Sequence, residues 1–187
     1  MPVATETVMY DVEDAKVSPL IADNATTITY GTPIDVPGIA EVGLDPNLIT
    51  AELKGDGGRV LAKKGKIDRM NFSATYGKLS LPILQAIMGG ATIQAGTTPN
   101  QTATYDLAGG TSMPYFRLEF QILDVDLGIG DLHVVLSKCQ LTGGTLITGS
   151  TDSFGQPSLE CEAIGTENGN KMMTVVINET PTAIAVA

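Results

Sequence analysis

Apolar and polar residues alternate over much of the chain, and a period of two is typical of a β-strand with one buried face. The clearest alternating stretches are 48–54, 69–76, 115–123, 158–164 and 171–179, with weaker strand signals at 11–20, 26–30 and 102–107. Residues 132–141 are apolar almost throughout, which is typical of a central strand. Because turn residues separate these stretches, the pattern predicts a mainly β chain built as an antiparallel β-sandwich.

One segment, residues 81–88 (LPILQAIM), has helical spacing of its apolar side chains. Ser80 is placed to cap the helix, Pro82 suits its first turn, and Gly89 can end it. A helix of this length needs packing to be stable, so we expect it to flank the sheet. The length of 187 residues predicts a single domain, 1–187, with residues 1–10 as an extended N-terminal arm.

Between the stretches 48–54 and 69–76, which we expect to pair, lies a connection of about fourteen residues. Residues 54–69 (KGDGGRVLAKKGKIDR) hold six basic and two acidic residues, a net charge of +4, whereas the rest of the chain carries −14. The basic residues are Lys54, Arg59, Lys63, Lys64, Lys66 and Arg69. A solvated loop is the alternative, but a cationic segment on an anionic body favours docking onto other copies of the chain. These six residues are the predicted subunit interface.

The net charge of −10 argues against nucleic acid as a tightly held ligand, because binding a polyanion requires clustered Lys and Arg. The first residues, MPVATETVMYDVEDAK, lack the charged and apolar regions of a signal peptide. No apolar run approaches transmembrane length, so we expect no membrane partner.

Candidate chemistry is sparse in this sequence. His133, the single histidine, lies within a predicted strand with no nucleophile placed beside it, which favours a structural role. Asp124, Asp126 and Asp131 lie in DVDLGIGD, where carboxylates around glycines can bind calcium, but the spacing is not that of an EF-hand and a hairpin turn is favoured. We therefore expect no catalytic residue, no metal and no cofactor.

Two further groups have simple interpretations. Gly55, Gly57 and Gly58 match neither phosphate-binding glycine motif, so a flexible loop is favoured there. Cys139 and Cys161 fall in predicted strands, where cysteine is usually a small buried apolar residue.

The ordered stretches DAKVSPL (14–20), TYGTPIDVPGI (29–39), LDPNLITAELKGDGG (44–58) and KIDRMNFSATYGKLSLPILQAIMGG (66–90) resemble the major tail tube proteins of long, non-contractile (siphovirus-type) phage tails. The resemblance implies a β-sandwich with a flanking helix that forms six-membered rings. These rings stack into a hollow tube, inner sheets joining edge to edge into a barrel. The long hairpin loop, here 54–69, bridges subunits or rings in such proteins.

The same resemblance implies a location in the virion tail, with assembly in the bacterial host cytoplasm. The implied partners are further copies of the chain, a tape-measure protein, and tail terminator and tip proteins, with DNA only in transit during genome ejection. It implies no enzymatic activity. An acidic wall would weaken DNA adhesion, and we expect Glu52, Glu160 and Glu162, on alternating strand faces, to supply part of a lumen-facing surface.

A different class of function, an Ig-like binding or decoration module on a virion or cell surface, is the alternative. Such a module rarely needs a long charged segment within its sheet and more often exposes aromatic residues for recognition. Five Tyr, four Phe and no Trp favour the tube subunit.

Overall fold

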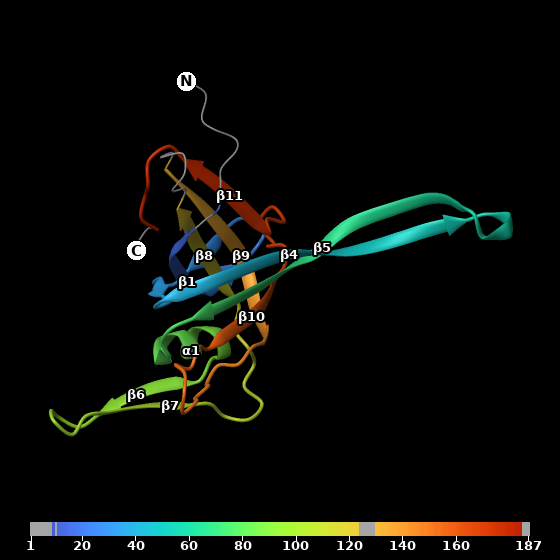
Figure 1. Ribbon diagram of the computed structural model, residues 1–187. Helices are drawn as coiled ribbons and strands as arrows, with labels where there is room; N and C mark the ends of the chain where they lie inside the picture. The colour runs from blue at the N-terminus through green and yellow to red at the C-terminus, as the bar shows by residue number, and fades with distance from the viewer. Residues whose placement is uncertain (1–8, 10, 124–129, 185–187) are drawn as a thin grey trace.

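The computed structural model describes residues 9, 11–123 and 130–184 (Figure 1). Its strands are β1 (Asp11–Asp23), β2 (Ile28–Tyr30), β3 (Ile34–Asp35), β4 (Ile39–Lys54), β5 (Val60–Tyr76), β6 (Ala91–Ala95), β7 (Thr102–Asp106), β8 (Phe116–Leu123), β9 (Asp131–Gly143), β10 (Ser158–Ala163) and β11 (Met173–Asn178). One α-helix, α1 (Leu81–Met88), and one 3-10 turn, η1 (Asp56–Gly58), complete the described elements.

Nine of the described strands form one antiparallel sheet, in which seven follow the order β2-β1-β8-β9-β10-β5-β4 and the other two, β3 and β11, pair with β1 and β9. Along one edge of β9, β11 pairs with its first part and β10 with its last part. In the same way, β3 and β2 pair with successive parts of one edge of β1. The remaining pair, β6 and β7, forms a separate ribbon. The predicted mainly β, antiparallel fold with one short flanking helix is confirmed, and the sheet within this one chain is not closed into a barrel.

The sheet bends strongly, so that its two halves face each other as the layers of a sandwich do. Phe72 on β5 and Phe120 on β8 have ring centroids only 5.5 Å apart, although β9 and β10 lie between their strands. In a flat sheet three strand spacings would separate them by about 14 Å. The core therefore fills the space inside this bend.

The residues that fill the core follow the period of two that the sequence predicts. On β5 and β8 the buried apolar positions are Met70, Phe72, Ala74 and Tyr76, and Phe116, Leu118, Phe120 and Ile122. Polar residues alternate with them, and the β5 partners at 71 and 73 are exposed. Strand β9 is buried along most of its length, as expected for a central strand.

Helix α1 begins and ends where the sequence predicts, and its buried side chains are Ile83, Leu84, Ala86 and Ile87. The prediction that the Ser80 side chain caps it is wrong, because that side chain makes no capping hydrogen bond. Instead the Ser80 carbonyl accepts a hydrogen bond from the Leu84 N–H at 3.2 Å. Gly89 ends the helix with a φ of 79°, as its lack of a Cβ allows.

The largest difference from the sequence prediction is the fourteen-residue connection. Strand β5 already begins at Val60, so the connection is only Gly55–Arg59 and the predicted basic loop at 54–69 is mostly strand. Residues 48–54 pair with 60–67, whereas 69–76 pair with 39–47. The strand was missed because the sequence AKKGKID has no buried face to give it an apolar period. No described helix is long and apolar enough to cross a membrane.

Replacing Ile87 with Ala tests whether α1 belongs to the same cooperative core. Ile87 is fully buried, so the substitution removes apolar contacts and leaves a cavity. We expect the free energy of unfolding, measured by urea denaturation, to fall by about 2–5 kcal/mol. Gln85→Ala, on the exposed side of the same helix, is the control and should change it by less than about 0.5 kcal/mol. Equal effects of the two substitutions would contradict the packing described.

Candidate assembly surfaces

The outer halves of β4 and β5 project from the body as a two-stranded hairpin (Figure 1). Strand β10 pairs with β5 only from Met70 to Thr75, and among the described strands residues 48–67 pair only within the hairpin. We call residues 48–67 the arm. At about 3.3 Å per residue, the stretch from Leu48 to Lys54 alone extends about 20 Å.

The tip of the arm is a tight glycine turn. The Gly55 N–H donates to the Arg59 carbonyl at 2.9 Å, and the Gly58 N–H donates to the Gly55 carbonyl at 3.1 Å. Gly57 and Gly58 have φ values of 73° and 79°, a region that side chains with a Cβ rarely adopt. The glycines interpreted from sequence as a flexible loop thus close the hairpin.

Large apolar side chains are exposed along the arm, each with between 46% and 62% of its surface accessible. They are Leu48, Ile49, Leu53, Val60, Leu61 and Ile67. Single exposed apolar residues are common on protein surfaces, but large ones gathered on one projecting element are typical of an interaction site. Sequence reasoning singled out the charges of this segment and missed its apolar side chains as a binding surface.

Strand register divides the arm into two faces, because directly opposite side chains of an antiparallel pair share a face. The lysine face comprises Ile49, Ala51, Leu53, Ala62, Lys64 and Lys66. The ion-pair face comprises Leu48, Thr50, Glu52, Lys63, Gly65 and Ile67. Lys63 Nζ lies 3.4 Å from Glu52 Oε1, so these two charges offset each other, and Lys54 follows on the same side at the tip of the arm. The lysine face carries two lysines and no carboxylate.

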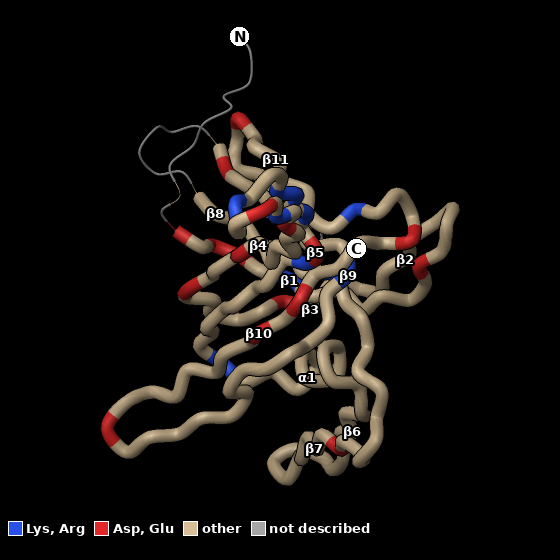
Figure 2. Tube along the Cα trace, turned by 90° about the vertical axis from the view of Figure 1, so that its right-hand side faces the viewer, with Lys and Arg blue, Asp and Glu red and all other residues tan. Residues whose placement is uncertain are grey.

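Five of the six predicted interface residues lie on or at the tip of the arm: Lys54, Arg59, Lys63, Lys64 and Lys66. Figure 2 views the molecule from the side on which the arm projects, and blue residues gather there. The sixth, Arg69, lies instead at the base of the arm. It donates a hydrogen bond to Glu162 at 2.7 Å and lies 3.0 Å from Asp68, and the bond to Glu162 raises the pKa of the guanidinium.

The outward side of the body strands β4, β5 and β10 is polar and acidic. Its carboxylates are Glu41, Asp45, Glu160 and Glu162, which we call the acidic face. The strand register places them on the same side of the three strands. Across the sheet, Glu41 on β4 is level with Thr75 on β5 and Ser158 on β10. Asp45 is level with Asn71 and Glu162 in the same way.

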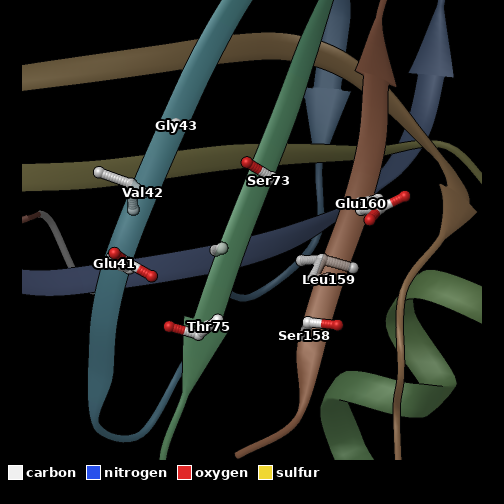
Figure 3. A pocket seen from close by; sticks show the side chains of 9 residues that line it. Glu41, Val42, Gly43, Ser73, Thr75, Ser158, Leu159 and Glu160 are labelled. Atoms are coloured by element: carbon white, nitrogen blue, oxygen red, sulfur yellow. The ribbon is translucent and has the colours of Figure 1, made fainter.

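Figure 3 shows the three strands side by side, with Glu41 on β4 and Glu160 on β10 separated by the short polar side chains of β5. Gly43 and Ser73 leave a shallow hollow of about 420 Å³ between the two carboxylates. No lysine or arginine lines this hollow, so the negative charges there have only solvent and small hydroxyl groups around them.

The structure brings together two of the three residues expected to face a lumen. Glu160 and Glu162 lie on one side of β10, while Leu159, Cys161 and Ala163 on its other side are buried. Glu52 lies apart from them on the arm, paired with Lys63. Glu41 and Asp45, which the sequence analysis did not select, join the acidic face because β4 pairs with β5 in a register that periodicity alone could not reveal.

A buried polar cluster lies at the other end of the sheet, around Asp131. This carboxylate has no solvent-accessible side-chain surface, and it accepts hydrogen bonds from the Thr182 N–H at 2.8 Å and Asn178 Nδ2 at 2.7 Å. Gln121 Nε2 also donates to it, and His133 Nε2 lies 2.9 Å away. Asp131 therefore holds the segment after β11 against β8 and β9.

This network explains the histidine that sequence reasoning assigned a structural role. His133 is buried and contacts Asp131, with Nδ1 3.9 Å from Glu119 Oε1. The carboxylate of Asp131 is occupied by protein donors, so it does not offer calcium a free ligand. Asp124 and Asp126, the other two residues of the calcium alternative, lie outside the described residues, and no group of metal ligands occurs in the described part of the chain.

Both cysteines are buried, with 0% and 1% of their surface exposed, as the sequence predicts. They are free thiols, and burial raises the pKa of the Cys139 thiol well above its usual value. A buried, protonated thiol is a poor nucleophile, so Cys139 acts as an apolar core residue.

The chain matches no protein-family model and has no significant sequence match among curated proteins. Among solved structures it is similar to the anti-feeding prophage cap, a tube-terminating cap determined by cryo-electron microscopy. That chain is 12% identical, the match covers 95% of this chain and 99% of that one, and the TM-score is 0.46. A similarity this weak assigns no function to the chain.

The Asp131 cluster predicts a specific acid sensitivity. Burial alone raises the pKa of Asp131, but the hydrogen bonds from Thr182, Asn178 and His133 outweigh it, so the pKa lies below the ordinary 3.8. A carboxyl group with a lowered folded pKa contributes stability above its unfolded pKa and loses it as pH falls through the folded value. We expect the free energy of unfolding to fall below about pH 4 partly through this group.

Asp131→Asn should lower the free energy of unfolding by about 2–4 kcal/mol at neutral pH and flatten its decline below about pH 4. Urea denaturation between pH 3 and pH 7 measures both effects, with Asp152→Asn in an exposed loop as the control. An acid decline equally steep in wild type and Asp131→Asn would show that other groups cause it.

Proposed function

We propose that this chain is a structural subunit of a phage tail tube, stacking as hexameric rings around a hollow conduit for DNA. The observation that carries the proposal is the arm: a projecting hairpin with exposed apolar side chains and excess positive charge on an acidic body. In an isolated subunit such an element leaves its apolar side chains in water and gains little stability. Its sequence lies within the stretches that resemble tail tube proteins, and the six-membered ring rests on that resemblance.

The magnitudes indicate how the arm contributes to binding. Exposed ion pairs are worth roughly 0.2–1 kcal/mol each, so the lysines mainly steer encounter and orientation. Fully burying a large aliphatic side chain contributes roughly 1.5–3 kcal/mol, and those of the arm have about half of that still to gain. Six of them per subunit outweigh the charges, so apolar contact supplies most of the affinity.

The open edges of the sheet are a second feature that supports a ring. Among the described strands, β4 and β11 each pair with one neighbour, and β11 has the exposed apolar residues Met173, Val175 and Val176. Such edges invite pairing with further strands, and head-to-tail pairing that closes gives a ring without edges. This is consistent with neighbouring sheets joining into one barrel.

The acidic face suits the wall of a DNA conduit. Carboxylates repel phosphates, and short polar side chains offer a passing duplex little to grip. Glu160 and Glu162 keep their proposed lumen-facing role and are joined by Glu41 and Asp45. Glu52, paired with Lys63, and Glu162, paired with Arg69, are the weaker candidates, because a basic side chain neutralises each charge.

In this proposal the chain performs no catalytic step and requires no cofactor. Its partners are other copies of itself, a tape-measure protein inside the tube, and tail terminator and tip proteins at the ends, and its location is the virion tail. Negative-stain imaging of the concentrated protein tests the class of function. Hollow rods or six-fold discs are expected, and dispersed monomers under all conditions would favour a binding or decoration module.

Charge reversal on the lysine face tests the role of the arm. We expect Lys64→Glu with Lys66→Glu to slow assembly at low salt by about tenfold or more and to weaken the salt dependence of its rate, followed by light scattering. The matched control exchanges the ion pair, Glu52→Lys with Lys63→Glu, and leaves the net charge of the arm unchanged. Assembly at the wild-type rate in the first variant would remove steering from the proposal.

Neutralising the acidic face tests the conduit wall. Glu41→Gln with Glu160→Gln removes two carboxylates around the hollow without changing side-chain size. Virions carrying this subunit should eject DNA more slowly at low ionic strength, because phosphates are repelled less. Ejection rates followed with a DNA dye measure the effect, with Asp152→Asn as a control that changes charge elsewhere. Unchanged ejection would place the acidic face outside the lumen.

A further inference from the structure

Both faces of the arm expose large apolar side chains, which is unusual for a two-stranded ribbon. Ile49 and Leu53 are exposed on the lysine face, and Leu48 and Ile67 are exposed on the ion-pair face. A hairpin that docks by one side needs apolar residues on that side only and places polar residues on the other, following the alternation of a half-buried sheet. Here the ion-pair face is polar at its centre, at Thr50, Glu52 and Lys63, but it still exposes the apolar pair Leu48 and Ile67 at the base of the arm.

We propose that each arm is clamped between two other copies of this chain, one against each face. This inference rests on the proposed function and adds to it the number of surfaces that hold one arm. In the assembled state the arm would then be covered on both faces, as an internal pair of strands is, instead of touching a neighbour on one face only.

The two faces differ in chemistry, so the copies that cover them present different surfaces. The lysine face carries Lys64 and Lys66 without a carboxylate, and it complements an acidic surface on a body that carries nineteen acidic and six basic residues outside the arm. On the ion-pair face, Lys63 and Glu52 satisfy each other, which leaves Leu48 and Ile67 to make apolar contact. One face is matched by charge and the other by apolar packing.

The reach of the arm permits this arrangement. A compact chain of 187 residues has a radius of gyration of about 16 Å, and the arm extends about 20 Å beyond the sheet. An arm of one copy therefore spans much of a neighbouring body. Nucleic acid is disfavoured as the occupant, because it would attract the lysines and leave the exposed apolar pair Leu48 and Ile67 in water.

Cysteine labelling separates clamping from one-sided docking. Thr50 and Ala51 are adjacent, exposed, and on opposite faces of the arm, so Thr50→Cys reports the ion-pair face and Ala51→Cys the lysine face. Cys139 and Cys161 are buried, so the wild type supplies an unreactive background for a maleimide probe. Each variant is labelled as dispersed subunits and again after assembly, which is monitored by electron microscopy.

We expect both cysteines to react readily in dispersed subunits and both rates to fall about tenfold or more on assembly, because an interface excludes solvent. Protection of one position only would overturn the clamp and leave the tail tube proposal intact. If neither is protected in well-formed tubes, the arm is not an interface at all. If no assembly forms under any condition, the proposed function fails, and this inference fails with it.

Substitution at the arm could itself disturb assembly. In that case Ala62→Cys on the lysine face and Ile67→Cys on the ion-pair face report the same two surfaces from β5. Agreement between the two pairs of positions also excludes an effect confined to one site.

Discussion

Beyond residue 47 of β4 and before residue 69 of β5, these two strands have only each other as partners in the described chain. This constraint governs the rest of the structure. An isolated two-stranded ribbon is marginally stable in water, because it buries little apolar surface. The arm nevertheless carries six large aliphatic side chains in contact with solvent. Its sequence is therefore suited to a state in which other surfaces cover it.

The base of the arm shows how the body supports it. Met70 and Phe72 on β5 are buried in the core, which fixes the direction in which the strand leaves the sheet. Asp68 is an extra residue in the register between β4 and β5, a bulge that shifts the side-chain alternation of β5 by one. Arg69 then joins the base to Glu162 on β10. The arm is thus attached to the sheet both by packing and by a charged hydrogen bond.

The sequence was sufficient to predict the half-buried strands and the helix, since each has an apolar period set by the core. It predicted the charge of the arm but not its structure, because residues 60–68 face no core and AKKGKID shows no period of two. Strand β6 was missed for a similar reason: its side chains are mostly exposed. Three partners of Asp131, namely Gln121, Asn178 and Thr182, lie 10 to 51 residues away in sequence, and the acidic face depends on a register that contains bulges. Such contacts arise from folding and leave no local pattern.

The change of sign along β4 decides which arrangements of two copies bring opposite charges together. By alternation, Glu41 and Asp45 near the body lie on the same side of the strand as the lysine face farther out. Two copies in parallel and in register place like charges together, which is repulsive. A copy displaced along the strand brings the lysines of one near the carboxylates of the next. Displacement repeated from copy to copy is a head-to-tail contact, the kind that builds rings and filaments and not closed pairs. The same uneven charge that steers the arm therefore also disfavours parallel, in-register pairing of two copies.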